Sequence, residues 1–85
     1  MAIYKKCTVH KNKSLNALKE FIDKNVNWAY SLDIETTKGK KSLFFEYPSG
    51  YPIWISKGLN SFEIKTEGHQ VPVSLLKKIK SFVQQ

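Results

Sequence analysis

The sequence predicts a small α+β domain in which two helices cover one face of a four-stranded antiparallel meander. Three observations lead to this prediction. Apolar and polar residues alternate with period two in the middle of the chain, short turn signals separate the alternating segments, and helical periodicity precedes and follows them. A loosely alternating N-terminal segment adds a possible edge strand, so the expected order is strand, helix, four strands, helix. Since the 85 residues contain no repeat or linker, we expect one basic domain spanning 1–85.

The first two elements are predicted from residues 3–26. Residues 3–9 alternate loosely, although Lys5 interrupts the apolar side, which is typical of an edge strand. A helix follows, with Ser14 or Asn12 as its N-cap. Its apolar residues fall on one face at 100° per residue. They are Leu15, Leu18, Phe21, Ile22 and Val26.

Three turns give the meander its predicted register, because a correct register pairs apolar residues with apolar residues. The turns are Lys38-Gly39, the three-residue loop 48–50, and Gly58-Leu59. The first pairs Ile34 with Leu43, Leu32 with Phe45 and Tyr30 with Tyr47; the second pairs Tyr47 with Tyr51, Phe45 with Ile53 and Leu43 with Ile55; the third pairs Ile55 with Phe62 and Ile53 with Ile64. We therefore expect a buried face that includes Tyr30, Leu32, Phe45, Ile53, Ile55 and Ile64.

The last helix is predicted to begin after Gly68 and to run about to the C-terminus. Pro72 suits a first helical turn, and an apolar stripe follows it. The stripe consists of Leu75, Leu76, Ile79, Phe82 and Val83. Helix, three strands and helix resemble the layout of the double-stranded-RNA-binding domain. This chain has a fourth strand and reads 70–73 as Gln-Val-Pro-Val, where that domain has a basic stretch, so we assign no family.

The outer face of the predicted sheet carries two large aromatic residues in a polar, acidic setting. Phe44 and Trp54 are expected to stand opposite each other, flanked by Asp33 and Glu63. These four residues are the candidate protein interface, for a homodimer or another partner. A plain cross-strand aromatic contact and base stacking are the alternatives. Carboxylates on this face, Asp33, Glu35, Glu46 and Glu63, disfavour a nearby phosphate backbone.

Positive charge predicts a polyanionic partner. The net charge is +7, all fourteen basic residues are lysines, and no arginine is present. Lysine neutralises phosphates but is less suited than arginine to reading bases, so little sequence specificity is expected. The candidate nucleic-acid-binding residues are Lys38, Lys40, Lys41, Lys77, Lys78 and Lys80. The alternatives are solvated charge, and an anionic membrane surface contacted by the last helix.

Catalytic and metal chemistry find little support in the sequence. Glu67 and His69 with a lysine offer a general acid–base arrangement of the kind that cleaves RNA, but both are expected at a strand end. Cys7 and His10 supply two metal ligands, and two more would have to come from afar. We therefore predict no enzyme activity, no catalytic residues, no metal and no cofactor.

These observations lead to an expected function and one alternative. The first is a non-enzymatic, nucleic-acid-associated module that contacts DNA or RNA phosphates through lysines and uses its outer sheet face for self-association or a partner. The alternative is a small protein-binding modulator or inhibitor, for example one encoded by a mobile element, that acts through Phe44 and Trp54. No apolar run approaches the length of a membrane span or a secretory signal, so we expect a cytoplasmic protein without membrane insertion.

Overall fold

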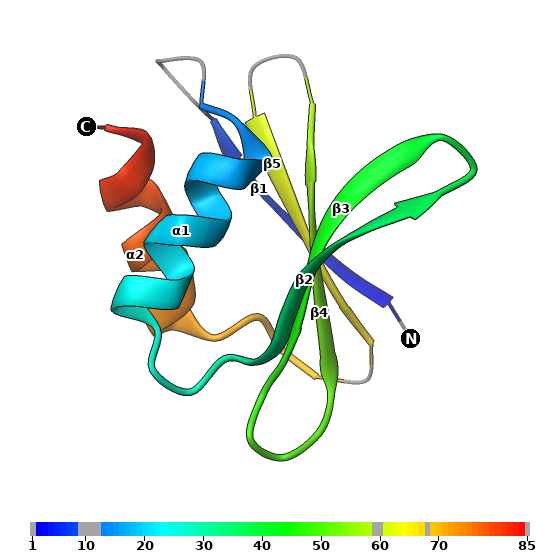
Figure 1. Ribbon diagram of the computed structural model, residues 1–85. Helices are drawn as coiled ribbons and strands as arrows, with labels where there is room; N and C mark the ends of the chain where they lie inside the picture. Colours follow the sequence, from blue (N-terminus) through cyan, green and yellow to red (C-terminus); the bar gives the residue numbers. More distant parts are fainter. Residues whose placement is uncertain (1, 9–12, 59–60, 68, 85) are drawn as a thin grey trace.

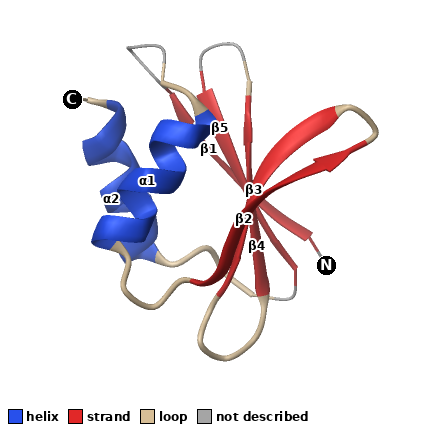
Figure 2. Ribbon diagram, in the orientation of Figure 1, coloured by secondary structure: helices blue, strands red, loops and turns tan. Residues whose placement is uncertain are grey.

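An antiparallel sheet with two helices on one face forms the fold of the computed structural model, which describes residues 2–8, 13–58, 61–67 and 69–84 (Figure 1, Figure 2). The elements are β1 (Ala2–Thr8), α1 (Leu15–Asn25), β2 (Tyr30–Thr37), β3 (Lys40–Glu46), β4 (Pro52–Lys57), β5 (Ser61–Glu67) and α2 (Val73–Val83). The five strands lie in the order β1-β5-β4-β3-β2. The predicted α+β architecture and element order are confirmed. The N-terminal edge strand is present as β1, which pairs with β5.

Local signals explain where the two helices begin. Ser14 has extended backbone geometry, and its Oγ accepts a hydrogen bond from the Ala17 N–H at 3.0 Å, so it is the N-cap of α1. Pro72 directly precedes α2, where its missing N–H costs no intrahelical hydrogen bond. The apolar stripes of both helices are turned toward the sheet and toward each other. Phe21 of α1 packs on Phe82 of α2 with ring centroids 4.8 Å apart.

The hydrophobic core lies between the helices and the inner face of the sheet. Helix α1 contacts β2 and β3, and α2 contacts β1 and α1. Phe45, Ile53, Ile55 and Ile64 are completely buried, as predicted. The other fully enclosed apolar side chains among the described residues are Leu18, Ile22, Leu43, Phe62, Leu75, Ile79 and Val83.

The first two hairpins have most of the predicted register. Ile34 is paired with Leu43, which in turn is paired with Ile55 on the other side. Lys38 and Gly39 both have positive φ, 53° and 80°, which is the geometry of a two-residue type I′ turn. The 48–50 loop is closed by backbone hydrogen bonds, including one from the Tyr47 N–H to the Tyr51 carbonyl at 3.0 Å.

The start of β2 differs from the prediction. The register shifts between Tyr30 and Asp33, so Tyr30 pairs with Glu46 rather than with Tyr47. Ser31 has a φ of 57°, a left-handed conformation that interrupts the alternation of side chains. Tyr30 is consequently 59% exposed and Leu32 is only half-buried. The predicted burial of Tyr30 is therefore wrong.

The third hairpin is shifted by two residues. Ile55 pairs with Ile64 and Ile53 with Thr66, so the predicted pairs of Ile55 with Phe62 and Ile53 with Ile64 are wrong. Leu59 of the predicted turn lies outside the described residues. A shift of two leaves every side chain on its expected face, so Phe62 is still buried. It also places Thr66 in the core, where its hydroxyl donates to the His69 carbonyl at 2.5 Å and is thereby satisfied.

Candidate functional site

The face of the sheet opposite the helices contains the predicted aromatic pair. Phe44 and Trp54 are register partners, with ring centroids 5.9 Å apart, and both side chains are half-buried. Asp33 pairs with Phe44 as expected. Lys65, and not Glu63, is the partner of Trp54, and its Nζ lies 5.1 Å from the Trp54 ring centroid. The predicted pairing of Glu63 with Trp54 is wrong, because the two-residue shift of β5 places Glu63 opposite Ser56.

Acidic side chains surround this aromatic pair. The register places Asp33, Glu35, Glu46, Glu63 and Glu67 on the same face. Lys65 forms a 3.7 Å ion pair with Glu67, and both groups are partly exposed. A shallow hollow of about 330 Å³ lies beside Trp54, with Glu63 and Lys65 in its lining. Phosphate groups are disfavoured on such a surface, whereas a polar or basic protein partner fits it.

The six predicted nucleic-acid-binding lysines fall into two separate groups. Lys38, Lys40 and Lys41 are exposed at the β2–β3 turn, which in Figure 1 projects away from the helices. Lys77, Lys78 and Lys80 lie on α2, at the opposite side of that view. The Lys78 Nζ donates to the backbone carbonyl of Asn25, at the end of α1. Lys78 therefore has a structural role in joining the two helices, while Lys77 and Lys80 are exposed on the helix surface.

A basic groove lies where the start of α1 approaches β2, β3 and the end of β4. It encloses about 310 Å³, and Lys41 and Lys57 contribute its cationic side chains. The other lining residues are Ser14, Leu15, Asn16 and Ile34. The first turn of α1 contains no acidic residue, so the positive end of its helix dipole is not neutralised there. Lys57 was not among the predicted residues. Its position directly before the predicted turn at Gly58 indicated that it ends a strand, and that end lies near the first hairpin.

A series of aromatic rings lies at loop positions, and of its contacts only the Tyr47–Tyr51 pair was predicted. The His69 ring stacks on Tyr51 with centroids 4.0 Å apart, and Tyr51 stacks on Tyr47 at 4.8 Å. Trp28 continues the series, 4.7 Å from Tyr47 in a tilted arrangement. Burial, and secondly the neighbouring Tyr47, raise the pKa of the Tyr51 phenol above its usual value. The phenol of Tyr51 therefore stays neutral to a higher pH than an ordinary tyrosine does.

The remaining reactive candidates are not brought into a site among the described residues. Glu67 is exposed in β5, and His69 is engaged through its ring with Tyr51 and through its carbonyl with Thr66. His10 lies outside the described residues, so the Cys7–His10 ligand pair is not described. In the described part of the chain, no group of three or more His, Cys, Asp or Glu residues is placed to hold a metal ion. No helix there is long and apolar enough to cross a bilayer.

Comparisons with protein-family models, curated proteins and solved structures find no match to this chain.

Proposed function

We propose that this protein is a non-enzymatic nucleic-acid-associated module that binds phosphate backbones through lysines with little sequence specificity. The observation that supports it best is the basic groove at the start of α1. There, Lys41 of β3 and Lys57 of β4 line a hollow that also includes Ser14 and Asn16 from the beginning of the helix. Lys38 and Lys40 extend the positive charge along the adjoining turn.

The helix adds to the lysines because its N-terminal N–H groups carry partial positive charge. Ser14 Oγ accepts a hydrogen bond from the Ala17 N–H, and no carboxylate in the first turn competes with an incoming anion for the positive end of the helix. Phosphate groups bind well at helix N-termini when nearby lysines neutralise their charge. Compact ammonium groups contact phosphates without the planar, bidentate geometry with which arginine reads guanine. Binding therefore depends on the backbone more than on the base sequence.

The acidic outer face of the sheet limits the directions from which a nucleic acid approaches. Glu46 and Glu63 lie on the sheet face that carries Phe44 and Trp54, where phosphate groups are repelled. A polyanion is thus directed toward the end of the sheet with the β2–β3 turn and away from the aromatic pair.

A salt titration with oligonucleotides of unrelated sequence tests this function. Affinity is expected to fall steeply between about 50 and about 200 mM salt, with a log–log slope of about −0.9 per phosphate contact on duplex DNA. Duplex and single-stranded probes of the same length identify the preferred nucleic acid. Undetectable binding at the lowest salt, or affinity that does not respond to salt, would contradict the proposal.

A second candidate function is carried by the aromatic pair: a protein-binding modulator, or an inhibitor, that acts through the outer sheet face. Phe44 and Trp54 lie at the centre of a helix-free face with a polar rim that includes Asp33. Interface hot spots have this arrangement of a buried or half-buried aromatic anchor within polar surroundings. Self-association is one form of this function, and binding of a different protein is the other.

Trp54→Ala is expected to weaken self-association or partner binding at least about tenfold, since truncation of a central aromatic anchor costs about 2 kcal/mol or more. The fold is expected to survive because Trp54 packs across the strands, outside the core under the helices. Sedimentation and partner titration measure the effect. Val73→Ala, which truncates an exposed apolar side chain on α2, is the control and should change neither. Equal effects of the two variants would argue against an interface at Trp54.

A further inference from the structure

We propose that the open edge of β2 binds an extended, lysine- or arginine-rich segment of a partner protein, which joins the sheet as an additional strand. This site adjoins the basic groove, with which it shares Asn16, and the outer face, with which it shares Asp33. It rests on three observations: an edge strand with backbone groups directed outward, a groove between that strand and α1, and carboxylates on both sides of the edge.

The backbone of β2 is suited to pairing with another strand. β2 is the last strand in the sheet order of the described residues. After a two-residue turn, alternate residues of a hairpin bond to the neighbouring strand, which leaves the N–H and C=O groups of Ile34 and Thr36 directed to the open edge. The Ile34 N–H is held by the Asp33 Oδ1 at 2.8 Å, in agreement with that outward direction. A carbonyl of an incoming strand replaces this carboxylate as the acceptor.

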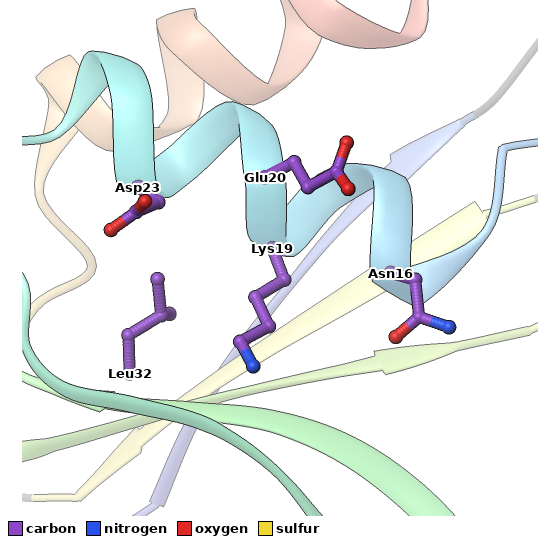
Figure 3. A pocket seen from close by; sticks show the side chains of 5 residues that line it. All are labelled: Asn16, Lys19, Glu20, Asp23 and Leu32. Carbon is purple, nitrogen blue, oxygen red and sulfur yellow. The ribbon is translucent and has the colours of Figure 1, made fainter.

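A groove of about 460 Å³ runs between α1 and β2. Its lining is shown in Figure 3: Asn16, Lys19, Glu20 and Asp23 come from α1, and Leu32 comes from β2. Lys19 and Asp23 extend from the helix toward the strand in that view. A strand added to β2 points alternate side chains into this groove, and the intervening ones toward the outer face of the sheet.

Carboxylates on both sides of the edge define the chemistry of the partner. Glu20 and Asp23 lie on the groove side, and Glu35 lies on the outer side. The Asp33 carboxylate lies at the edge itself, within reach of the Ile34 N–H and of Lys19 from α1. Successive basic residues of an extended segment therefore meet acidic groups on both faces. Complementary charges of this kind steer association and select the partner.

Lys19 occupies part of this site in the unbound protein. Its Nζ lies 3.9 Å from the Asp33 Oδ1, and both side chains are substantially exposed. Exposed ion pairs contribute little to stability, so a basic side chain of the partner displaces Lys19 from Asp33 readily.

A second copy of this chain is a poorer occupant of the edge. Antiparallel pairing of β2 with its own copy brings Asp33 and Glu35 of one protomer close to the same carboxylates of the other. Like charges on directly opposed strands destabilise a sheet. The carboxylates also repel nucleic acid from this edge.

Titration with three synthetic peptides tests the proposal. The first is an extended sequence of lysines interrupted by valines, the second has glutamate in place of lysine, and the third is the first peptide with N-methyl groups on consecutive backbone nitrogens, so that both of its edges are blocked. We expect only the first to bind well, with at least about tenfold lower affinity for the N-methylated form, because strand addition needs those N–H groups. Amide NMR signals of Ile34 and Thr36 should shift and gain protection from exchange.

Two charge-matched variants complete the test. Glu20→Gln/Asp23→Asn should lower affinity for the lysine peptide at least about threefold. Glu63→Gln/Glu67→Gln, which removes the same charge from the outer face at β5, should have the smaller effect, because β4 and β3 separate β5 from β2. The proposal would be overturned if the lysine peptide did not bind, or if the N-methylated peptide bound equally well. Equal effects of the two variants, or sedimentation as a β2-linked dimer, would also overturn it. None of these outcomes depends on nucleic-acid binding.

Discussion

Phe45→Ala is expected to destabilise the protein by about 3–5 kcal/mol, which is a large share of the roughly 5–15 kcal/mol that stabilises a typical domain. Phe45 is completely buried between the sheet and the helices, and Trp28 packs against its ring at 5.9 Å. Alanine leaves a cavity at this position, because the surrounding side chains belong to several elements and cannot all move in to fill it. Chemical denaturation followed by circular dichroism should show the unfolding midpoint of the variant at a much lower denaturant concentration than that of the unaltered protein.

Phe44→Ala is the matched control, because the same residue type is removed from the adjacent position on the opposite face. The variant loses the half-buried Phe44 ring and its packing against Trp54 across the strands. We expect this loss to lower the stability by a smaller amount, on the order of 1 kcal/mol. Similar destabilisation of the two variants would contradict the assignment of one core face and one open face to the sheet.

Lys38→Glu/Lys40→Glu/Lys41→Glu is expected to reduce oligonucleotide affinity about a hundredfold. Each lysine–phosphate interaction is worth about 1 kcal/mol in a solvent-exposed setting, and about 1.4 kcal/mol corresponds to a tenfold change. The slope of log affinity against log salt should also become shallower by about 0.9 for each phosphate that is no longer neutralised. The reduction should be similar for unrelated sequences, because these lysines bind the backbone.

A variant with the same change in net charge controls for long-range attraction. Lys24→Glu/Lys77→Glu/Lys80→Glu alters lysines on the helices and leaves Lys78, which donates to the Asn25 carbonyl, unchanged. Its effect should be the smaller of the two and should largely vanish at higher salt, where exposed distant charges are screened. A greater reduction of affinity in this variant would move the nucleic-acid interface to α2, the other predicted lysine group.

The extent to which the fold followed from the sequence is illustrated by two hairpins. The register of β3 against β4 was predicted correctly, because a shift of one residue there sets Phe45 against Trp54 and mixes the faces. The register of β5 was missed by two residues, since an even shift preserves the face of every side chain and the apolar pattern does not distinguish the alternatives. One polar consequence of the shift, the burial of Thr66, depends on a hydrogen bond to His69 that the pattern does not contain.

The candidate sites were harder to predict because they combine distant segments. The Phe44–Trp54 pair follows from local register, and it was predicted. Lys57 beside Lys41, and His69 on Tyr51, depend on how loops and strand ends meet in space. The exposure of Tyr30 depends on the left-handed backbone of Ser31, which serine does not signal, since glycine and asparagine are the usual residues there.

The pairing of β1 with β5 has a consequence for the order in which the chain folds. Each strand of the β2–β5 meander finds its partner next to it in sequence, so each hairpin closes a short loop. β1 pairs with β5, and α1 and most of the meander lie between these two strands in the sequence. Helix α2 packs against both β1 and α1. Closing so long a loop has a high entropic cost before any contact compensates for it. Among the described strands, β1 is therefore expected to be the last to join the sheet, because its partner β5 follows β2, β3 and β4 in the sequence.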